Sequence, residues 1–149
     1  MAIVSGLAPE TEETPRAAGW FPGRRSDTSG WRTRFEETGL AMHDAADDFL
    51  REFGGLQVGA HGSGITCARE AFHLDPLLVW NSEEDRFAEW GEEIGRALFP
   101  VGELDQGRFF LGIDEQAELY VVETWVASFG RLPAAMDNLV LGVMPTPVA

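Results

Sequence analysis

The sequence has no lysine and only 11 basic residues, all of them arginine, against 25 aspartates and glutamates. The formal net charge is −14 at pH 7. An electrostatic field of this sign repels nucleic acids and anionic membranes and attracts cationic partners, so we expect no binding to nucleic acid or to membrane. A simpler interpretation is that the charge only keeps the protein soluble, because acidity by itself does not specify a function.

Cysteine and long apolar runs are also scarce. The single Cys67 excludes an internal disulfide and is typical of a reducing cytoplasm. No run of about 18 apolar residues is present, so no transmembrane helix is predicted. The N-terminus has no basic region followed by an apolar stretch, which predicts that there is no signal peptide. We therefore expect a cytoplasmic protein, whose oligomeric state the sequence does not define.

The few residues that could carry metal or nucleophile chemistry do not form a recognisable site. The three histidines (His43, His61 and His73) do not pair with each other or with Cys67 at metal-ligand spacing. Structural zinc needs four nitrogen or sulfur ligands, so we expect no metal and no cofactor. The G-x-x-G-x-G stretch at 59–64 precedes no predicted helix and indicates a plain turn rather than a phosphate-binding loop. Cys67 lacks a neighbouring histidine to act as its base, which favours a buried, inert thiol.

Glu123 lies inside an apolar run, on the same face as Leu119 and Val121. If buried there, its carboxyl would have a raised pKa and could act as an acid or a base. The alternative is a structural carboxylate that pairs with an arginine or lies at the exposed end of a sheet. Asp114 and Glu115 lie in a predicted turn and lack the 12-residue ligand spacing of a calcium loop. No catalytic set emerges, so we predict that the protein is not an enzyme.

The stretch 98–125 is expected to be the centre of the fold. Three apolar and β-branched runs alternate there with two groups of turn residues: 98–101, Asp105-Gln106-Gly107, 108–113, Asp114-Glu115-Gln116 and 119–125. This pattern predicts an antiparallel meander of three strands, in which Gly107 takes a positive φ. Both faces of the second and third runs are apolar, so the meander should be buried on both sides.

Helices and further strands are expected to surround this centre. Apolar residues recur at helical spacing in four segments, and two shorter segments have the character of strands. The predicted helices cover 28–38, 42–53, 82–96 and the residues after Pro133, and the predicted strands cover 56–60 and 65–74. Short connections favour antiparallel pairing, so we predict an α+β fold with helices packed on a mostly antiparallel sheet.

One domain is expected over 19–143, with Trp20 and Phe21 as a hydrophobic anchor at its start. The residues 1–18 have no sustained apolar period and should form a disordered tail, and 144–149 should form a C-terminal tail.

Two of the predicted helices carry many acids opposite their apolar stripes. They are Asp44, Asp47 and Asp48 on one helix, and Glu84, Asp85, Glu89, Glu92 and Glu93 on the other. Such a face either docks a basic partner or is simply a solvated helix surface. Because the acids oppose the apolar stripes, their charge should be reversible without disturbing the core.

Five fragments, taken in order, resemble the SUKH superfamily and its third subfamily most closely. They are GWFPGR at 19–24, FLREFGGL at 49–56, LFPVGEL at 98–104, FLGID at 110–114 and LYVVE at 119–123. The resemblance runs over about 18–143. It implies a SUKH-like single α+β domain, which agrees with the fold predicted from the residues, and it offers no catalytic residues to carry over.

The resemblance implies a role in bacterial immunity. Such proteins are encoded beside secreted polymorphic toxins, often nucleases or nucleic-acid deaminases, and they block the toxin domain by binding it. A toxin that acts on nucleic acid usually presents a basic cleft, which an acidic inhibitor can occupy, so a basic toxin domain is the expected partner. Two alternatives stay open: an intracellular scaffold or regulatory binding module of the same fold, and a small enzyme that uses Glu123 or His73.

Overall fold

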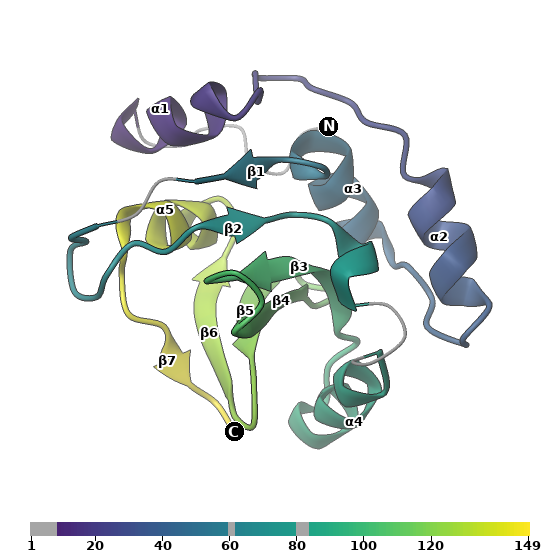
Figure 1. The fold of residues 1–149 in the computed structure, drawn as a ribbon. Coiled ribbons are helices and arrows are strands. Elements are labelled where there is room, and N and C mark those ends of the chain that lie inside the picture. Colours follow the sequence, from purple (N-terminus) through teal and green to yellow (C-terminus); the bar gives the residue numbers. More distant parts are fainter. Residues whose placement is uncertain (1–8, 60–61, 80–83) are drawn as a thin grey trace.

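An antiparallel sheet of seven strands forms the centre of the molecule (Figure 1). Strand order follows chain order from β1 to β7. The computed structural model describes residues 9–59, 62–79 and 84–149. Its elements are α1 (Pro9–Ala17), α2 (Ser29–Glu36), α3 (Asp44–Phe53), β1 (Gln57–Val58), β2 (Phe72–His73), the 3₁₀ helix η1 (Pro76–Val79), α4 (Glu84–Ile94), β3 (Phe99–Leu104), β4 (Phe109–Ile113), β5 (Glu118–Val122), β6 (Val126–Arg131), α5 (Ala134–Leu141) and β7 (Thr146–Pro147). The predicted α+β fold with a mostly antiparallel sheet is confirmed.

The predicted meander forms the middle of the sheet, with one strand more than expected. β4 and β5 pair antiparallel, with Leu111 opposite Val121. The turn between β3 and β4 has positive φ at its three central residues, including +87° at Gly107 as predicted. The third predicted run was too long, because β5 ends at Val122 and residues 123–125 turn the chain into β6. That turn contains no Gly, Pro, Asn or Asp, so composition gave no signal for it.

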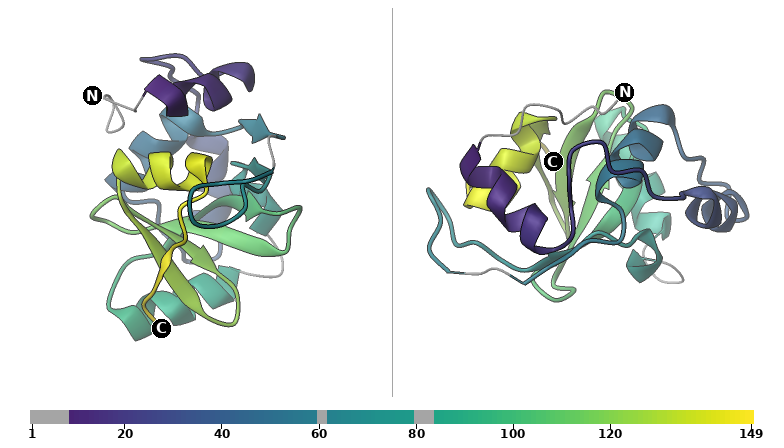
Figure 2. Two further views of the ribbon diagram at one scale, coloured as in Figure 1. Left: turned by 90° about the vertical axis from the view of Figure 1, so that its left-hand side faces the viewer. Right: turned by 90° about the horizontal axis from the view of Figure 1, so that it is seen from above.

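Both faces of the meander are covered (Figure 2). α3 and α5 lie over one face, where the larger core includes Phe49 and Phe99. α4 lies over the opposite face, where Phe87 belongs to a smaller core. Successive strand residues point to opposite faces, so β5 sends Val121 into the larger core and Tyr120 into the smaller one. The expectation of a meander buried on both sides is confirmed.

The GWFPGR segment holds the C-terminal end of α3. The Trp20 ring is buried, and its Nε1–H donates to Glu52 Oε2 over 3.1 Å. The Arg24 guanidinium donates to the carbonyl oxygens of Glu52 and Gly54 over 2.8 and 2.9 Å, which satisfies acceptors that a helix end leaves unpaired. The predicted anchor is therefore right for Trp20 but wrong for Phe21, which is 53% exposed.

The two ends of the chain contain more structure than the sequence indicated. Residues 9–17, expected within a disordered tail, form α1, in which Thr11 and Pro15 are buried. Residues 1–8 lie outside the described part of the chain. Near the other end, β7 pairs with β6, with Thr146 opposite Ser128. These short elements gain their stability from packing and pairing, which a local pattern does not encode.

The first two strands are shorter than predicted. β1 and β2 have two residues each, and 60–61 lie outside the described residues. Within 65–74 the amides of residues 65–67 donate instead to the carbonyl oxygens of Leu141 and Gly142, over 2.9 to 3.0 Å. This attachment to the end of α5 uses the donors that a strand ladder would need. The predicted helix start at Ser82 also lies outside the described residues.

Candidate partner-binding surfaces

The acids of α4 form one exposed face. Helical geometry places residues i, i+4, i+7 and i+8 on one side of a helix, and Asp85, Glu89, Glu92 and Glu93 follow this spacing. All four side chains are exposed, whereas the opposite side of the helix packs on the sheet. We call these four residues the α4 acidic face. The side chain of Glu84, the fifth acid predicted here, is outside the part that the structure describes.

Arg86 interrupts the acids of α4 in sequence but is directed to the end of β5. Its Nη1 lies 3.8 Å from Glu123 Oε1. Hydrogen bonds from the backbone and side chain of Thr124 lower the pKa of Glu123, and the charge of Arg86 lowers it further. Glu123 is therefore the structural, arginine-paired carboxylate of our second interpretation. The interpretation of Glu123 as a buried acid or base with a raised pKa is wrong.

Asp47 of α3 has a structural role. Its carboxylate accepts hydrogen bonds from Thr28 Oγ1 and from Arg51 Nε (2.7 Å), and it lies 3.5 Å from Arg32 Nη2. Burial alone would raise the pKa of Asp47, but these hydrogen bonds and charges outweigh burial and lower it. Arg32 lies in α2 and Thr28 directly precedes that helix, so Asp47 joins α2 to α3. These contacts lead us to expect that reversing the charge of Asp47 costs stability, unlike reversal at an exposed position of the helix.

The other acids of α3 lie apart from the α4 acidic face. Asp44 is exposed and Asp48 is half-buried. α3 and α4 cover opposite faces of the sheet (Figure 2), so the seven predicted acids whose side chains the structure describes do not form one continuous surface. The start of α3 is held by His43, whose Nδ1 accepts from the Ala46 amide (3.1 Å) while Nε2 faces the Ala97 carbonyl oxygen (2.9 Å). This pattern assigns the ring proton to Nε2.

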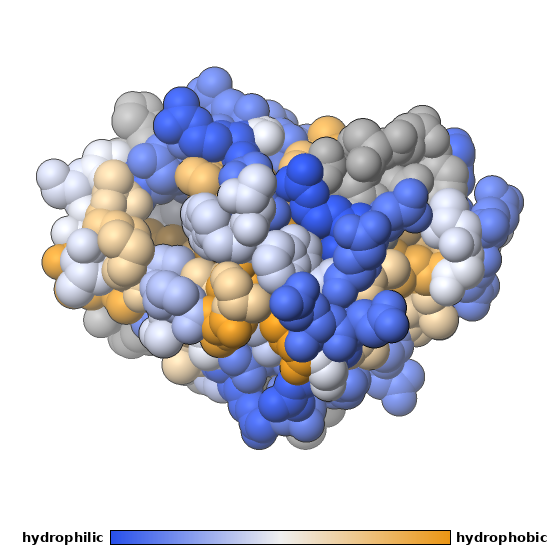
Figure 3. All heavy atoms as spheres, turned by 90° about the horizontal axis from the view of Figure 1, so that it is seen from below, coloured by the Kyte–Doolittle hydropathy of each residue, from blue (hydrophilic) through white to orange (hydrophobic). Residues whose placement is uncertain are grey.

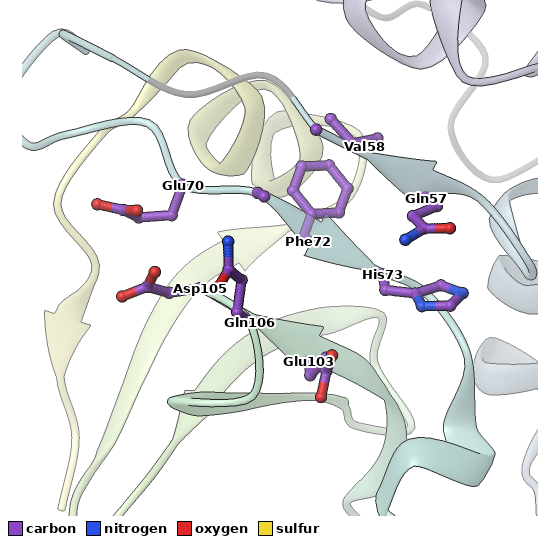
Figure 4. A pocket seen from close by; sticks show the side chains of 10 residues that line it. Gln57, Val58, Glu70, Phe72, His73, Glu103, Asp105 and Gln106 are labelled. Atoms are coloured by element: carbon purple, nitrogen blue, oxygen red, sulfur yellow. The ribbon is translucent and has the colours of Figure 1, made fainter.

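A second acidic surface lies across β1, β2 and β3 (Figure 4). Gln57, His73 and Glu103 follow one another across the three strands, because His73 is paired with both of the others. Glu70 and Asp105 lie close together to one side of this row, near the start of β2 and just after the end of β3. The hollow that these side chains line has a volume of about 480 Å³. We call it the acidic cleft.

The chemistry of the acidic cleft favours a cationic group from a partner. Three carboxylates line it, and no arginine is among its described lining residues. Asp105 lies 3.5 Å from the guanidinium of the exposed Arg108 at the cleft's margin. Carboxylates arranged around a hollow accept charge-assisted hydrogen bonds from lysine or arginine. Among the described residues, no group of three or more His, Cys, Asp or Glu side chains is arranged to hold a metal ion.

The sequence did not reveal the acidic cleft, because pairing of short strands creates it. Phe72 lies opposite Leu104, and His73 lies opposite Glu103, although the two segments are far apart in the chain. A strand of two residues has too little pattern to define its register. The one available signal was Glu103, which is the only acid in an otherwise apolar strand.

The remaining candidates have ordinary roles. Cys67 is half-buried rather than buried, and burial together with the charge of Glu70 raises the pKa of its thiol, so it is a poor nucleophile at neutral pH. The glycine-rich stretch belongs to the loop attached to α5, and no described helix starts directly after it. No described helix has both the length and the apolar character that crossing a bilayer requires.

Comparison with known protein families places the chain in one of them. The family model of the SUKH-3 immunity protein matches residues 7–142, a range that includes every element from α1 to α5. No curated protein and no solved structure matches the chain. SUKH immunity proteins are generally not enzymes. The chain belongs to the SUKH-3 immunity protein family.

Proposed function

We propose that this protein binds and neutralises one cognate toxin domain of a bacterial polymorphic toxin system, in the cytoplasm of the cell that makes the toxin. The toxin domain is a nuclease or a nucleic-acid deaminase, and the protein inhibits it by covering its basic substrate-binding surface. Membership of an immunity protein family supports binding to a toxin. The acidity of the chain supports the basic character of that partner.

The α4 acidic face is the observation that carries this mechanism. It presents four exposed carboxylates on two turns of one helix, and the arginine of the same helix is directed to Glu123. A surface that binds nucleic acid presents lysine and arginine side chains toward phosphates, and carboxylates can occupy the same side chains. The net charge of −14 adds long-range attraction to the local complementarity.

Electrostatic attraction of this kind acts mainly on the association rate. Charges at the edge of an interface steer the encounter and are screened within about 8–10 Å at physiological salt. The proposal therefore predicts association that slows as salt is added. Dissociation depends instead on the packed contacts at the centre of the interface and should change less.

A charge reversal on α4 tests the mechanism. The variant Glu89→Lys with Glu92→Lys and Glu93→Lys changes the net charge by six units, from −14 to −8. Because the three side chains are exposed, the fold should tolerate the change within about 1 kcal/mol. We expect this variant to associate at least about tenfold more slowly with the toxin domain at low salt, and to protect cells less well.

A matched control separates the position of the charge from its total. Glu13→Lys with Glu36→Lys and Glu37→Lys makes the same change in net charge at exposed positions in α1, at the end of α2 and directly after α2. The control should keep most of the association rate. If association slows equally in both variants, total charge alone matters. If association of the α4 variant is unchanged, α4 does not face the toxin.

A further inference from the structure

An apolar groove lies beside the acidic cleft, on the face of the sheet that α5 covers. Its volume is about 320 Å³. The end of α5 and the residues after it form one wall, the loop before β2 forms another, and strands β3 to β6 form the floor. The side chains that define it are Leu104, Phe109, Val121, Trp125, Phe129 and Met144. We call it the apolar groove.

Two large apolar side chains at this groove are open to solvent. Trp125 is 39% exposed and Met144 is 61% exposed. The Trp125 ring lies 5.7 Å from the ring of Phe109, so it is held in place by an aromatic contact. Tryptophan and methionine are enriched in protein interfaces, where a few such residues contribute most of the binding energy. Figure 3 shows that apolar side chains are exposed among polar ones on the face of the molecule that is seen from below.

Backbone hydrogen bonds hold the walls of the groove together. The amides of Ile65, Thr66 and Cys67 donate to the carbonyl oxygens at the end of α5, over 2.9 to 3.0 Å. The Met144 amide donates to Thr66 Oγ1 over 2.7 Å. A further bond of 2.7 Å joins the Asn138 side chain to the Phe129 carbonyl oxygen. The groove is therefore formed before any partner binds, which reduces the entropic cost of binding.

The charges around the groove define the partner that fits it. Glu70 lines both the apolar groove and the acidic cleft, so the two hollows adjoin at this side chain. Beyond it lie Glu103 and Asp105 of the cleft. No arginine is among the described residues that line either hollow. Among the described residues that line the groove, Glu70 is the one charged side chain, so a partner group next to an apolar side chain placed there would face a carboxylate.

We propose that the apolar groove is the anchor of the interface with the toxin domain. It takes one bulky aliphatic or aromatic side chain of the toxin, and a lysine or arginine beside that side chain reaches Glu70 and the acidic cleft. This inference rests on the proposed function. It adds a second contact region to the α4 acidic face, one that acts on dissociation rather than on association, because buried apolar contacts govern the lifetime of a complex.

Met144→Arg is the first test, with Phe21→Arg as its matched control. Both residues are large, apolar and more than half exposed, and only Met144 lines the groove. The probe is the toxin domain encoded by the gene next to this one, inactivated by a substitution in its own catalytic site. We expect Met144→Arg to dissociate at least about tenfold faster and Phe21→Arg to behave like the wild type. Trp125→Ala should weaken binding by about 30-fold or more.

Protection of the single thiol is the second test. Cys67 lines the groove, so an occupant should slow its alkylation by a maleimide reagent at least about tenfold in the complex. This readout uses the wild-type chain and does not depend on the stability of any variant. Thermal unfolding of Trp125→Ala, measured alongside, separates loss of fold from loss of the contact.

The outcomes distinguish the inference from the proposed function. A complex that forms normally, with unchanged dissociation of Met144→Arg and an unprotected Cys67, overturns the groove and leaves immunity standing. A toxin domain that forms no complex with the wild-type chain overturns both. Faster dissociation of Met144→Arg but not of Phe21→Arg, together with protection of Cys67, supports the groove.

Discussion

Gly112 of β4 and Phe87 of α4 provide a stability test of how α4 is mounted on the sheet. A Cβ atom built on Gly112 would lie 2.5 Å from Phe87 Cε1 and 3.2 Å from Phe87 Cδ1, well inside contact distance. Gly112→Ala should therefore push the Phe87 ring and the helix outward. Such overpacking costs about 1–3 kcal/mol in the free energy of unfolding. At this chain length, each kcal/mol lowers the melting temperature by about 2–4 °C.

Equilibrium unfolding in urea measures this cost, and a double-mutant cycle assigns it. Phe87→Leu removes Cε1, the atom nearest to the added Cβ, so Gly112→Ala should cost less in the Phe87→Leu background, with a favourable coupling of about 0.5–3 kcal/mol. Gly30→Ala is the control, because nothing lies within 4 Å of a Cβ there and alanine favours the helix by about 0.5–1 kcal/mol. Additive effects, or a cost of Gly112→Ala below about 0.5 kcal/mol, would refute the packing of α4 that presents its acidic face.

Two further predictions concern buried carboxyl groups. Asp114 accepts hydrogen bonds from two backbone amides (2.8 and 3.0 Å) and from the Tyr120 hydroxyl (2.8 Å). Asp114→Ala should therefore lower the free energy of unfolding by about 3–5 kcal/mol. Asp114→Asn should lower it clearly less, because asparagine keeps an acceptor for the amides. Unfolding in denaturant gives both values, and equal costs would contradict this role. Glu52 is only 2% exposed, and burial raises its pKa above the ordinary 4.5 despite the hydrogen bond from Trp20, so the folded state holds this proton more tightly than the unfolded chain. The stability that comes from this more tightly held proton is present below pH 4.5 and is lost as pH rises through the folded-state pKa of Glu52. Between pH 4 and pH 8, the stability of wild type relative to Glu52→Gln should therefore decrease. A difference that stays constant over this range would contradict the shift.

Sequence patterns predicted the long elements well because their burial is periodic. The stripe of α3 and the runs of β4 and β5 have enough residues to define one face or two, and packing in the structure follows them. The GWFPGR and FLREFGGL fragments lie far apart in the sequence. The structure joins them, because Arg24 and Trp20 hydrogen-bond to the end of α3. Nothing in either fragment alone specifies that contact.

Sequence patterns failed where tertiary context determines the structure. β6 was missed because the turn before it, around Thr124, has no typical turn residue. Asp47 was assigned to a docking face because a helix pattern shows only which side is polar, and its partners on α2 come from another element. The acidic cleft depends on β2 and on the loop before it, and the apolar groove depends on the same loop. In that loop the amides of residues 65–67 donate to the end of α5 and not to a neighbouring strand. No local sequence pattern indicates this.

The central claim is that this chain neutralises a toxin domain by binding it. Its most direct test is to produce, in bacteria, the toxin domain that the proposal expects the neighbouring gene to encode, with and without this protein, and to measure growth together with the mass of the purified complex. The account predicts that cells grow only when the protein is present, and that the two chains co-elute as a stable complex of defined stoichiometry. Growth arrest despite the protein, with the two chains eluting separately, would contradict it.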